Sequence, residues 1–138
     1  MKYLAIDFGE KRTGIAASDA GGSIAFARTT IRKESKEMFW AELLRIIWKE
    51  EAEALVVGMP KTREGGKTLL IRQIRNFIAS LKRQCSLPVY IMEETLSSFE
   101  AETKLRDLKK SRAGLDGAAA ASILESFLNL PEEKRILA

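Results

Sequence analysis

The chain has 138 residues, 30% of them charged, and its formal net charge is +4 at pH 7. It contains no histidine and one cysteine, which excludes His-based catalytic triads, His-ligated zinc and clusters of thiolate ligands. Any catalysis must therefore rest on carboxylates, hydroxyls, lysine or arginine, or on a metal ion held by oxygen ligands.

We expect a single domain over 1–138, because this length is typical of one domain with a continuous core. No apolar stretch approaches the length that crosses a bilayer, and the N-terminus enters a predicted strand without a signal-peptide pattern. These features predict a cytoplasmic protein. Cys85 follows an apolar helical face, and we interpret it as an inert, half-buried thiol.

The first predicted strand ends on a carboxylate. Residues 3–6 are apolar, Asp7 follows them, and a polar turn over 9–14 contains Lys11 and Arg12. A short apolar run before a turn indicates a strand buried on both faces. A carboxylate is costly to desolvate there, so Asp7 should be paired, lie at the open end of the sheet or hold a cation. Taken alone, Asp7 is more simply explained as bonding the amides of its own turn.

Two further strands are predicted over 14–19 and 23–30, joined by a turn whose residues tolerate positive φ. Asp19 in this turn is interpreted as a turn former. The first three strands would then form an antiparallel meander.

An amphipathic helix is predicted from an N-cap at Ser35 to about Glu51. Trp40 and Trp48 widen its apolar face to about half of the helix circumference, more than a surface helix needs. We interpret this face as packing well into the sheet. An oligomer contact edged by the two tryptophans is the alternative.

A parallel strand is predicted over 54–58, because this continuous apolar run follows a helix. The polar loop after it, over 61–67, contains Lys61 and Arg63. Loops at the carboxyl ends of parallel strands usually line the site of an open α/β sheet, so we interpret this loop as a contact to the substrate backbone. An ordinary solvated loop is almost as good an explanation of this stretch alone.

The last predicted strand also ends on carboxylates. A helix with a solvated basic face is expected over about 69–84, and the strand over 88–92 is followed by Glu93 and Glu94. Residues 97–100 match a capping box, which predicts the start of another helix.

A basic segment follows that helix start. This segment has more basic residues than solubility alone requires. They are Lys104, Arg106, Lys109, Lys110 and Arg112. We interpret the segment as an arm that holds phosphates beside a carboxylate site, and a solvated surface segment is the alternative. The final helix is predicted over about 115–130, with Asp116 in its first turn, where capping is the common role of aspartate.

This order of elements predicts an α/β fold with a five-stranded mixed sheet, three antiparallel strands and then two parallel ones, and helices on both faces. If the last strand lies near the first, Asp7, Glu94 and Asp116 can converge. Three carboxylates repel one another unless a divalent cation lies between them, and oxygen ligands select Mg²⁺ or Mn²⁺. One or two such ions can activate water against a phosphodiester.

Four segments carry a recognisable pattern: DFGEKRTGIA at 7–16, VVGMP at 56–60, EETLSSFEA at 93–101, and DGAAA through ILE at 116–125. Their order and spacing resemble the YqgF/RuvX family of bacterial RNase H-like proteins, which are provisionally described as pre-16S rRNA nucleases and, earlier, as Holliday-junction resolvases. The resemblance implies an RNase H-like fold. It also implies a metal-dependent nuclease site formed by Asp7, Glu94 and Asp116.

Two positions depart from the pattern of that family. The family usually has Asp-Glu-Arg where this chain has Glu93, Glu94 and Thr95, so a cation that could contact phosphate is missing. The family also usually carries Asn where Thr62 stands. The metal carboxylates remain, so these departures concern the positioning of the substrate.

We therefore expect a metal-dependent endonuclease that hydrolyses phosphodiester bonds, in 5′-end maturation of pre-16S rRNA during ribosome biogenesis. One alternative is a Holliday-junction resolvase in DNA recombination and repair, which would need a homodimer with paired sites, whereas a processing nuclease could act as a monomer. A ribosome-maturation factor that binds RNA with little cleavage is the alternative outside the enzymes. A kinase-like nucleotide-binding fold would need two lobes, and this chain has length for one.

The residues expected to contact nucleic acid are basic and lie in the first turn, the loop after the predicted parallel strand and the basic segment. They are Lys11, Arg12, Lys61, Arg63, Lys104, Lys109, Lys110 and Arg112.

Overall fold

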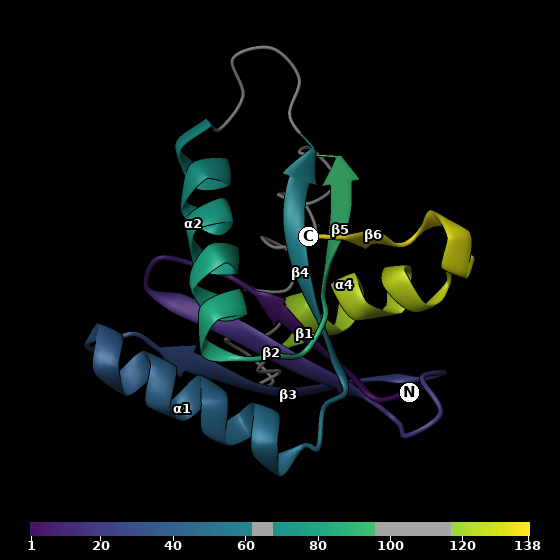
Figure 1. Ribbon diagram of the computed structural model, residues 1–138, viewed down its shortest axis with the longest axis horizontal. Helices are drawn as coiled ribbons and strands as arrows, with labels where there is room; N and C mark the ends of the chain where they lie inside the picture. The colour runs from purple at the N-terminus through teal and green to yellow at the C-terminus, as the bar shows by residue number, and fades with distance from the viewer. Residues whose placement is uncertain (62–67, 96–116) are drawn as a thin grey trace.

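The computed structural model describes residues 1–61, 68–95 and 117–138, and within them six strands form one sheet in the order β3-β2-β1-β4-β5-β6 (Figure 1). The strands are β1 (Tyr3–Asp7), β2 (Arg12–Ser18), β3 (Ala25–Arg32), β4 (Ala54–Lys61), β5 (Val89–Thr95) and β6 (Ile136–Leu137). The helices are α1 (Lys36–Lys49), α2 (Thr68–Gln84), α4 (Ala118–Leu128) and the short 3-10 helix η1 (Glu132–Lys134). Among these described segments, no helix is long and apolar enough to cross a membrane.

Strand β1 lies in the middle of the sheet. On one side β2 pairs with it antiparallel, with Asp7 opposite Gly14, and on the other side β4 pairs with it parallel. β5 continues parallel to β4. The ends of β1, β4 and β5 at Asp7, Lys61 and Thr95 therefore meet at one edge of the sheet, which we call the carboxyl edge. This topology confirms the predicted α/β class, with an antiparallel meander followed by two parallel strands.

The predicted strand number of five is wrong by one. The short strand β6 pairs antiparallel with the outer side of β5, with Ile91 opposite Ile136. Arg135 holds the chain there: its guanidinium lies 4.7 Å from the ring centroid of Phe127 and donates a hydrogen bond to the Tyr3 hydroxyl at 3.0 Å. Two residues are too few to show the alternation of a strand, so the sequence indicated only a helical end.

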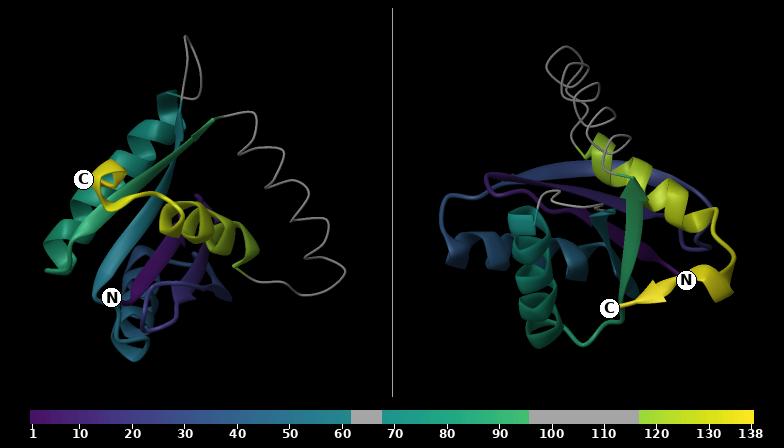
Figure 2. Two further views of the ribbon diagram at one scale, coloured as in Figure 1. Left: turned by 90° about the vertical axis from the view of Figure 1, so that its right-hand side faces the viewer. Right: turned by 90° about the horizontal axis from the view of Figure 1, so that it is seen from above.

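Helices cover both faces of the sheet, as predicted (Figure 2). On one face a buried cluster joins Leu4 and Ile6 of β1 to α1 and α2, and on the other face a second cluster joins Tyr3 and Ala5 to α4. Successive residues of a strand point to opposite faces, so this alternation assigns each position of β1 to one face.

Helix α1 begins at the predicted cap. The hydroxyl of Ser35 accepts a hydrogen bond from the backbone amide of Met38 at 3.1 Å. The buried stripe consists of Phe39, Leu43, Ile46 and Ile47. Trp40 is half-buried against this core, but the prediction that Trp48 packs into the sheet is wrong, because that residue is 81% exposed. Trp48 follows Ile47 directly, and successive residues of a helix are about 100° apart around its axis, so the side chain of Trp48 lies outside the buried stripe.

The turn between β2 and β3 confirms Asp19 as a turn former. Its carboxylate accepts hydrogen bonds from the backbone amides of Ile24 at 2.8 Å and Ser23 at 2.7 Å. These two hydrogen bonds stabilise the charged carboxylate and so lower the pKa of Asp19 below its usual value, and the bond from Ile24 has the larger effect. Because β2 runs from the carboxyl edge toward this turn, Asp19 lies at the opposite end of the sheet from Asp7.

Helix α4 packs on the sheet over small residues. Ala5, Ala16 and Ala54 belong to its buried cluster, and Gly58 of β4 faces the helix at Ile123. A Cβ atom placed on Gly58 would lie 2.5 Å from Cδ1 and 3.2 Å from Cγ1 of Ile123. Helix α4 can therefore pack this close to β4 only because Gly58 has no side chain.

We predict that Gly58→Ala lowers the free energy of unfolding by about 1–3 kcal/mol, because it overpacks the contact with α4. Ile123→Val alone should cost about 0.5–1.5 kcal/mol, and it removes the Cδ1 atom that the new methyl group would meet. The double variant should therefore lose less stability than the two single losses added together. Urea unfolding of the wild type and the three variants measures this coupling.

The control is Gly21→Ala, whose Cβ would make ordinary contacts of 3.5 Å to Asp19 and 3.9 Å to Ser23. Its stability should stay within about 0.5 kcal/mol of the wild type. Strict additivity of Gly58→Ala and Ile123→Val would show that the close contact with Ile123 does not limit this position.

Candidate active site

Asp7 is the last residue of β1 and lies half-buried at the carboxyl edge. By the alternation of β1 it shares the face of Tyr3 and Ala5, which is the face covered by α4. A Cβ atom placed on its partner Gly14 would lie 3.6 Å from Cβ of Asp7 and 3.7 Å from Cβ of Ala120. The side chain of Asp7 therefore begins beside the first turn of α4, with no side chain on Gly14 to cover it.

Gly117 brings the start of α4 to the same point. It is buried, has a φ of +80°, and its Cα would lie 3.7 Å from the Cβ placed on Gly14. A Cβ on Gly117 itself would collide with the carbonyl oxygen of Ile15 and lie 3.1 Å from the backbone nitrogen of Arg28. The pairing of β2 with β3 shifts register between Ile15 and Ala16. Gly117 lies against the backbone of the two strands beside this shift. Only glycine satisfies both the conformation and the space.

The backbone of Glu94 lies in β5 at the same edge. In the parallel ladder of β4 and β5, Gly58 is opposite Met92 and Pro60 is opposite Glu94. Met92 packs against the buried cluster under α4. Because a strand repeats every two residues, position 94 lies on the same face as Met92 and therefore on the face of Asp7.

The structure therefore places two of the three predicted site residues at one edge and on one face of the sheet. Asp116, the third, lies outside the described residues, and the side chain of Glu94 is not described. Within the described part of the chain, no group of three Asp, Glu, Cys or His residues could hold a metal ion. The predicted site of Asp7, Glu94 and Asp116 stays a prediction.

Three of the basic residues predicted to contact nucleic acid lie in the described segments, and five lie outside them. Lys11 and Arg12 are exposed in and after the turn that follows Asp7, and Lys61 ends β4 at the carboxyl edge. A Cβ on Gly9 would collide with the carbonyl oxygen of Arg12, so glycine is needed to fold this turn back. The remaining predicted contacts lie outside the described residues: Arg63, Lys104, Lys109, Lys110 and Arg112.

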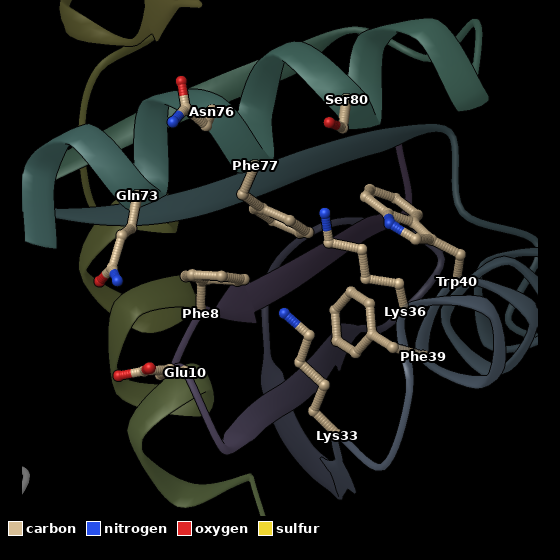
Figure 3. Close-up of a pocket in the computed structure, with 10 residues that line it drawn as sticks. All are labelled: Phe8, Glu10, Lys33, Lys36, Phe39, Trp40, Gln73, Asn76, Phe77 and Ser80. Atoms are coloured by element: carbon tan, nitrogen blue, oxygen red, sulfur yellow. The ribbon is translucent and has the colours of Figure 1, made fainter.

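The sequence interpretation missed a cavity of about 390 Å³ on the other face of the sheet (Figure 3). Phe8 lines it directly after Asp7, and Lys33 and Lys36 line it from the end of β3 and the start of α1. The predicted antiparallel meander contained a signal for the two lysines, because it returns the end of the third strand to the start of the second, where the structure pairs Arg32 with Arg12. Residues just after β3 must therefore lie near the end of β1.

Comparison with known proteins identifies relatives along most of the chain. The model of the family RuvX, described as Holliday junction resolvase, matches residues 1–130. A protein of Nitratidesulfovibrio vulgaris (strain DSM 19637 / Miyazaki F) is 56% identical, with 98% of each chain covered, and one of Lawsonia intracellularis is 44% identical, with 99% of each covered. A protein of Chloroflexus aurantiacus (strain J-10-fl) is 35% identical, with 91% of this chain and 85% of that protein covered. All three carry the provisional name of pre-16S rRNA nuclease.

Two solved structures with a similar fold are described as complexes with Holliday-junction DNA. RuvC of T. thermophilus in complex with a Holliday junction substrate has a TM-score of 0.65 at 12% identity, covering 100% of this chain and 99% of RuvC. The fowlpox virus resolvase in complex with junction DNA has a TM-score of 0.54 at 12% identity, covering 93% and 97%. At these identities the likeness concerns the fold, and it confirms the predicted RNase H-like class.

We predict that Gly117→Ala and Gly14→Ala differ sharply in stability, although the two glycines lie in contact. Gly117→Ala should lower the free energy of unfolding by about 2–4 kcal/mol, because it combines a left-handed backbone with overpacking against Ile15. Gly14→Ala should change it by less than about 1 kcal/mol, because its new contacts of 3.6 and 3.7 Å are ordinary. Urea unfolding of both variants tests this, and equal losses would contradict the backbone contact at Gly117.

Proposed function

The chain belongs to the RuvX family, and we propose that it is a divalent-metal-dependent endonuclease that acts on pre-16S rRNA in the bacterial cytoplasm. The observation that carries the proposal is the convergence of chain segments at the carboxyl edge. Asp7 ends β1 there, Glu94 occupies a position on the same face of β5, and Gly117 lies against the same point as Asp7. The provisional names of the relatives support the choice of an rRNA precursor.

Asp116 is proposed as the third carboxylate because it is bonded to Gly117, whose place in the fold is known. Asp116 directly precedes Gly117 in the sequence. Gly117 is buried against the backbone of β2 and β3, beside Gly14 and therefore beside Asp7. This contact supports Asp116 as the third carboxylate, with Asp7 and Glu94 as the other two.

The donor set of such a site suits a hard cation. The proposed ligands are carboxylates in a chain without histidine, and Gly14, the strand partner of Asp7, lies beside the small residues Gly117 and Ala120. Asp7, Glu94 and Asp116 would hold Mg²⁺ or Mn²⁺. When bound, the ion supplies an activated water and stabilises the charge on the leaving oxygen.

The chain itself contributes position and charge. Asp7 cannot swing away with a flexible loop, because it is the last paired residue of a strand with a neighbour on each side. Lys11 and Arg12 are exposed next to Asp7 in the chain, and Lys61 is the last residue of β4; in the proposed function these residues would hold the phosphates on either side of the bond that is cut. Phosphate contacts of this kind orient the substrate without reading its sequence.

A resolvase is the second candidate, because the family model is described as Holliday junction resolvase and the fold is that of RuvC. Cutting a four-way junction symmetrically requires two sites, and therefore a homodimer. Cutting a precursor RNA requires one site, and a monomer suffices. Cleavage of the two substrates under the same conditions separates these two functions.

We predict that Asp7→Asn, Glu94→Gln and Asp116→Asn each reduce Mn²⁺-dependent cleavage by at least about a hundredfold while the protein stays folded. Each change keeps the size of the side chain and removes the negative charge that binds the ion. The measurement is cleavage of a ribosomal precursor RNA and of a synthetic four-way junction, side by side.

Asp19→Asn is the matched control, because it makes the same chemical change at the opposite end of the sheet, and it should cleave like the wild type. Full activity of any of the three site variants would remove that residue from the site. Symmetric cutting of the junction without cutting of the RNA would replace the rRNA nuclease by the resolvase. Binding of RNA with no cutting of either substrate would favour a binding factor.

We predict further that neutralising Lys109, Lys110 and Arg112 together weakens binding of the precursor RNA and reduces its salt dependence. For every phosphate that the variant no longer binds, the slope of log K against log salt should fall by about 0.7–0.9. Replacement of Lys49, Lys82 and Arg83 by glutamine removes the same charge from the ends of α1 and α2 and serves as the control. An unchanged slope in the variant neutralised at Lys109, Lys110 and Arg112 would show that these residues do not bind phosphates and belong to an ordinary solvated surface.

A further inference from the structure

The cavity on the face opposite α4 has a wall of aromatic rings. Phe77 of α2 stacks with Phe8 at 4.6 Å between centroids and with Trp40 of α1 at 5.5 Å, both within 25° of parallel, at 22° and 24°. Phe77 is buried, whereas Phe8 and Trp40 are half-buried, so parts of their rings remain accessible from the cavity. Accessible aromatic rings of this kind are the surfaces on which unpaired bases stack.

Two lysines face these rings. Figure 3 shows Lys33 and Lys36 extending their amines toward the space between the aromatic side chains, while the carboxylate of Glu10 points away from them. The Nζ atom of Lys33 lies 5.9 Å from the ring centroid of Phe39. Within residues 1–61, 68–95 and 117–138, neither amine takes part in an ion pair. Their positive charge is therefore available to an anionic ligand.

Helix α2 supplies the polar part of the cavity. Gln73, Asn76 and Ser80 line it with two amides and a hydroxyl, which can both donate and accept hydrogen bonds. The volume of about 390 Å³ is in the range of sites for small molecules. An aromatic wall, polar hydrogen-bonding groups and a pair of cations together fit a planar base that carries a phosphate.

The cavity is joined to the candidate active site through β1. Asp7 and Phe8 are consecutive, and Asp7 faces α4 whereas Phe8 packs with the cluster of α1 and α2. The carboxylate and the cavity therefore lie on the two sides of the same strand end. One strand of nucleic acid that crosses the carboxyl edge can reach both of them.

We propose that this cavity binds one nucleotide of the substrate in single-stranded form, with its base against Phe8 and Trp40 and its phosphate at Lys33 and Lys36. The inference deepens the proposed nuclease function and rests on it for the identity of the strand. A base in a duplex is already stacked and paired, so it cannot enter the cavity. The substrate must accordingly have an unpaired segment close to the bond that is cut.

The test uses the fluorescence of Trp40 in a Trp48→Phe background, which removes the other, exposed tryptophan. Asp7→Asn is added so that RNA is not cleaved. Titration with a short single-stranded RNA should quench Trp40 saturably, and the same RNA annealed to its complement should not. Replacing Lys33 and Lys36 by glutamine should weaken the binding about tenfold or more and lower its salt slope by about one.

Glutamine at Lys49 and Lys134 removes the same charge from the end of α1 and from η1, outside the cavity, and this control should bind like the Trp48→Phe/Asp7→Asn parent. Binding that is unaffected by the change at Lys33 and Lys36, or quenching by the duplex equal to that by the single strand, would overturn the proposal. Adenosine monophosphate is titrated in parallel. If it binds as tightly as the RNA, the cavity is a site for free nucleotides and the strand contact is overturned.

The outcome is independent of whether the protein cleaves. Quenching of Trp40 in the Asp7→Asn background, together with no cleavage by the wild-type protein, would retain the nucleotide site and refute the proposed nuclease. Cleavage that is lost in Asp7→Asn, without any quenching of Trp40, would retain the nuclease and refute the site.

Discussion

The close approach of α4 to the sheet is the contact on which the candidate active site depends. Gly117 passes over the backbone of β2 and β3, and Gly58 lets Ile123 reach β4. At both positions a Cβ atom would occupy space that another atom already fills. The first turn of α4 is thereby fixed beside Gly14, the strand partner of Asp7. Close packing at these glycines sets the distance between this helix and the sheet.

The alternation of a strand divides the functions of the carboxyl edge between two faces. Asp7 faces α4 and Phe8 faces the opposite layer, although they are neighbours in the chain. The first face combines a carboxylate with small residues, and the second combines aromatic rings with lysines. A single rigid strand can therefore align a site for chemistry with a site for a base, because the two sides of its backbone are fixed relative to each other.

Charge supports this division. The chain contains no histidine, so a neutral imidazole general base is absent, and the proposed mechanism assigns the activation of water to an oxygen-bound cation. The exposed cations Lys11 and Arg12 follow Asp7 directly, and Lys33 and Lys36 lie where β3 returns to the same edge. In the proposed function these cations would attract phosphates of a nucleic acid to both sides of the edge, while the net charge of the whole chain stays modest at +4.

The sequence by itself determined strands β1 to β5, helices α1, α2 and α4, and their order along the chain. The apolar runs before Asp7 and before Glu93, the cap at Ser35 and the turn at Asp19 depend on residues close in the chain, so local patterns predict them. It could not determine β6, the exposure of Trp48 or the rings around Phe77, because each depends on contacts between distant segments. The tertiary structure alone decided that Asp7 and Gly117 share one contact, and that Phe8 turns to the other face. Strand register and helix packing set these distances, and both arise only when the whole chain has folded.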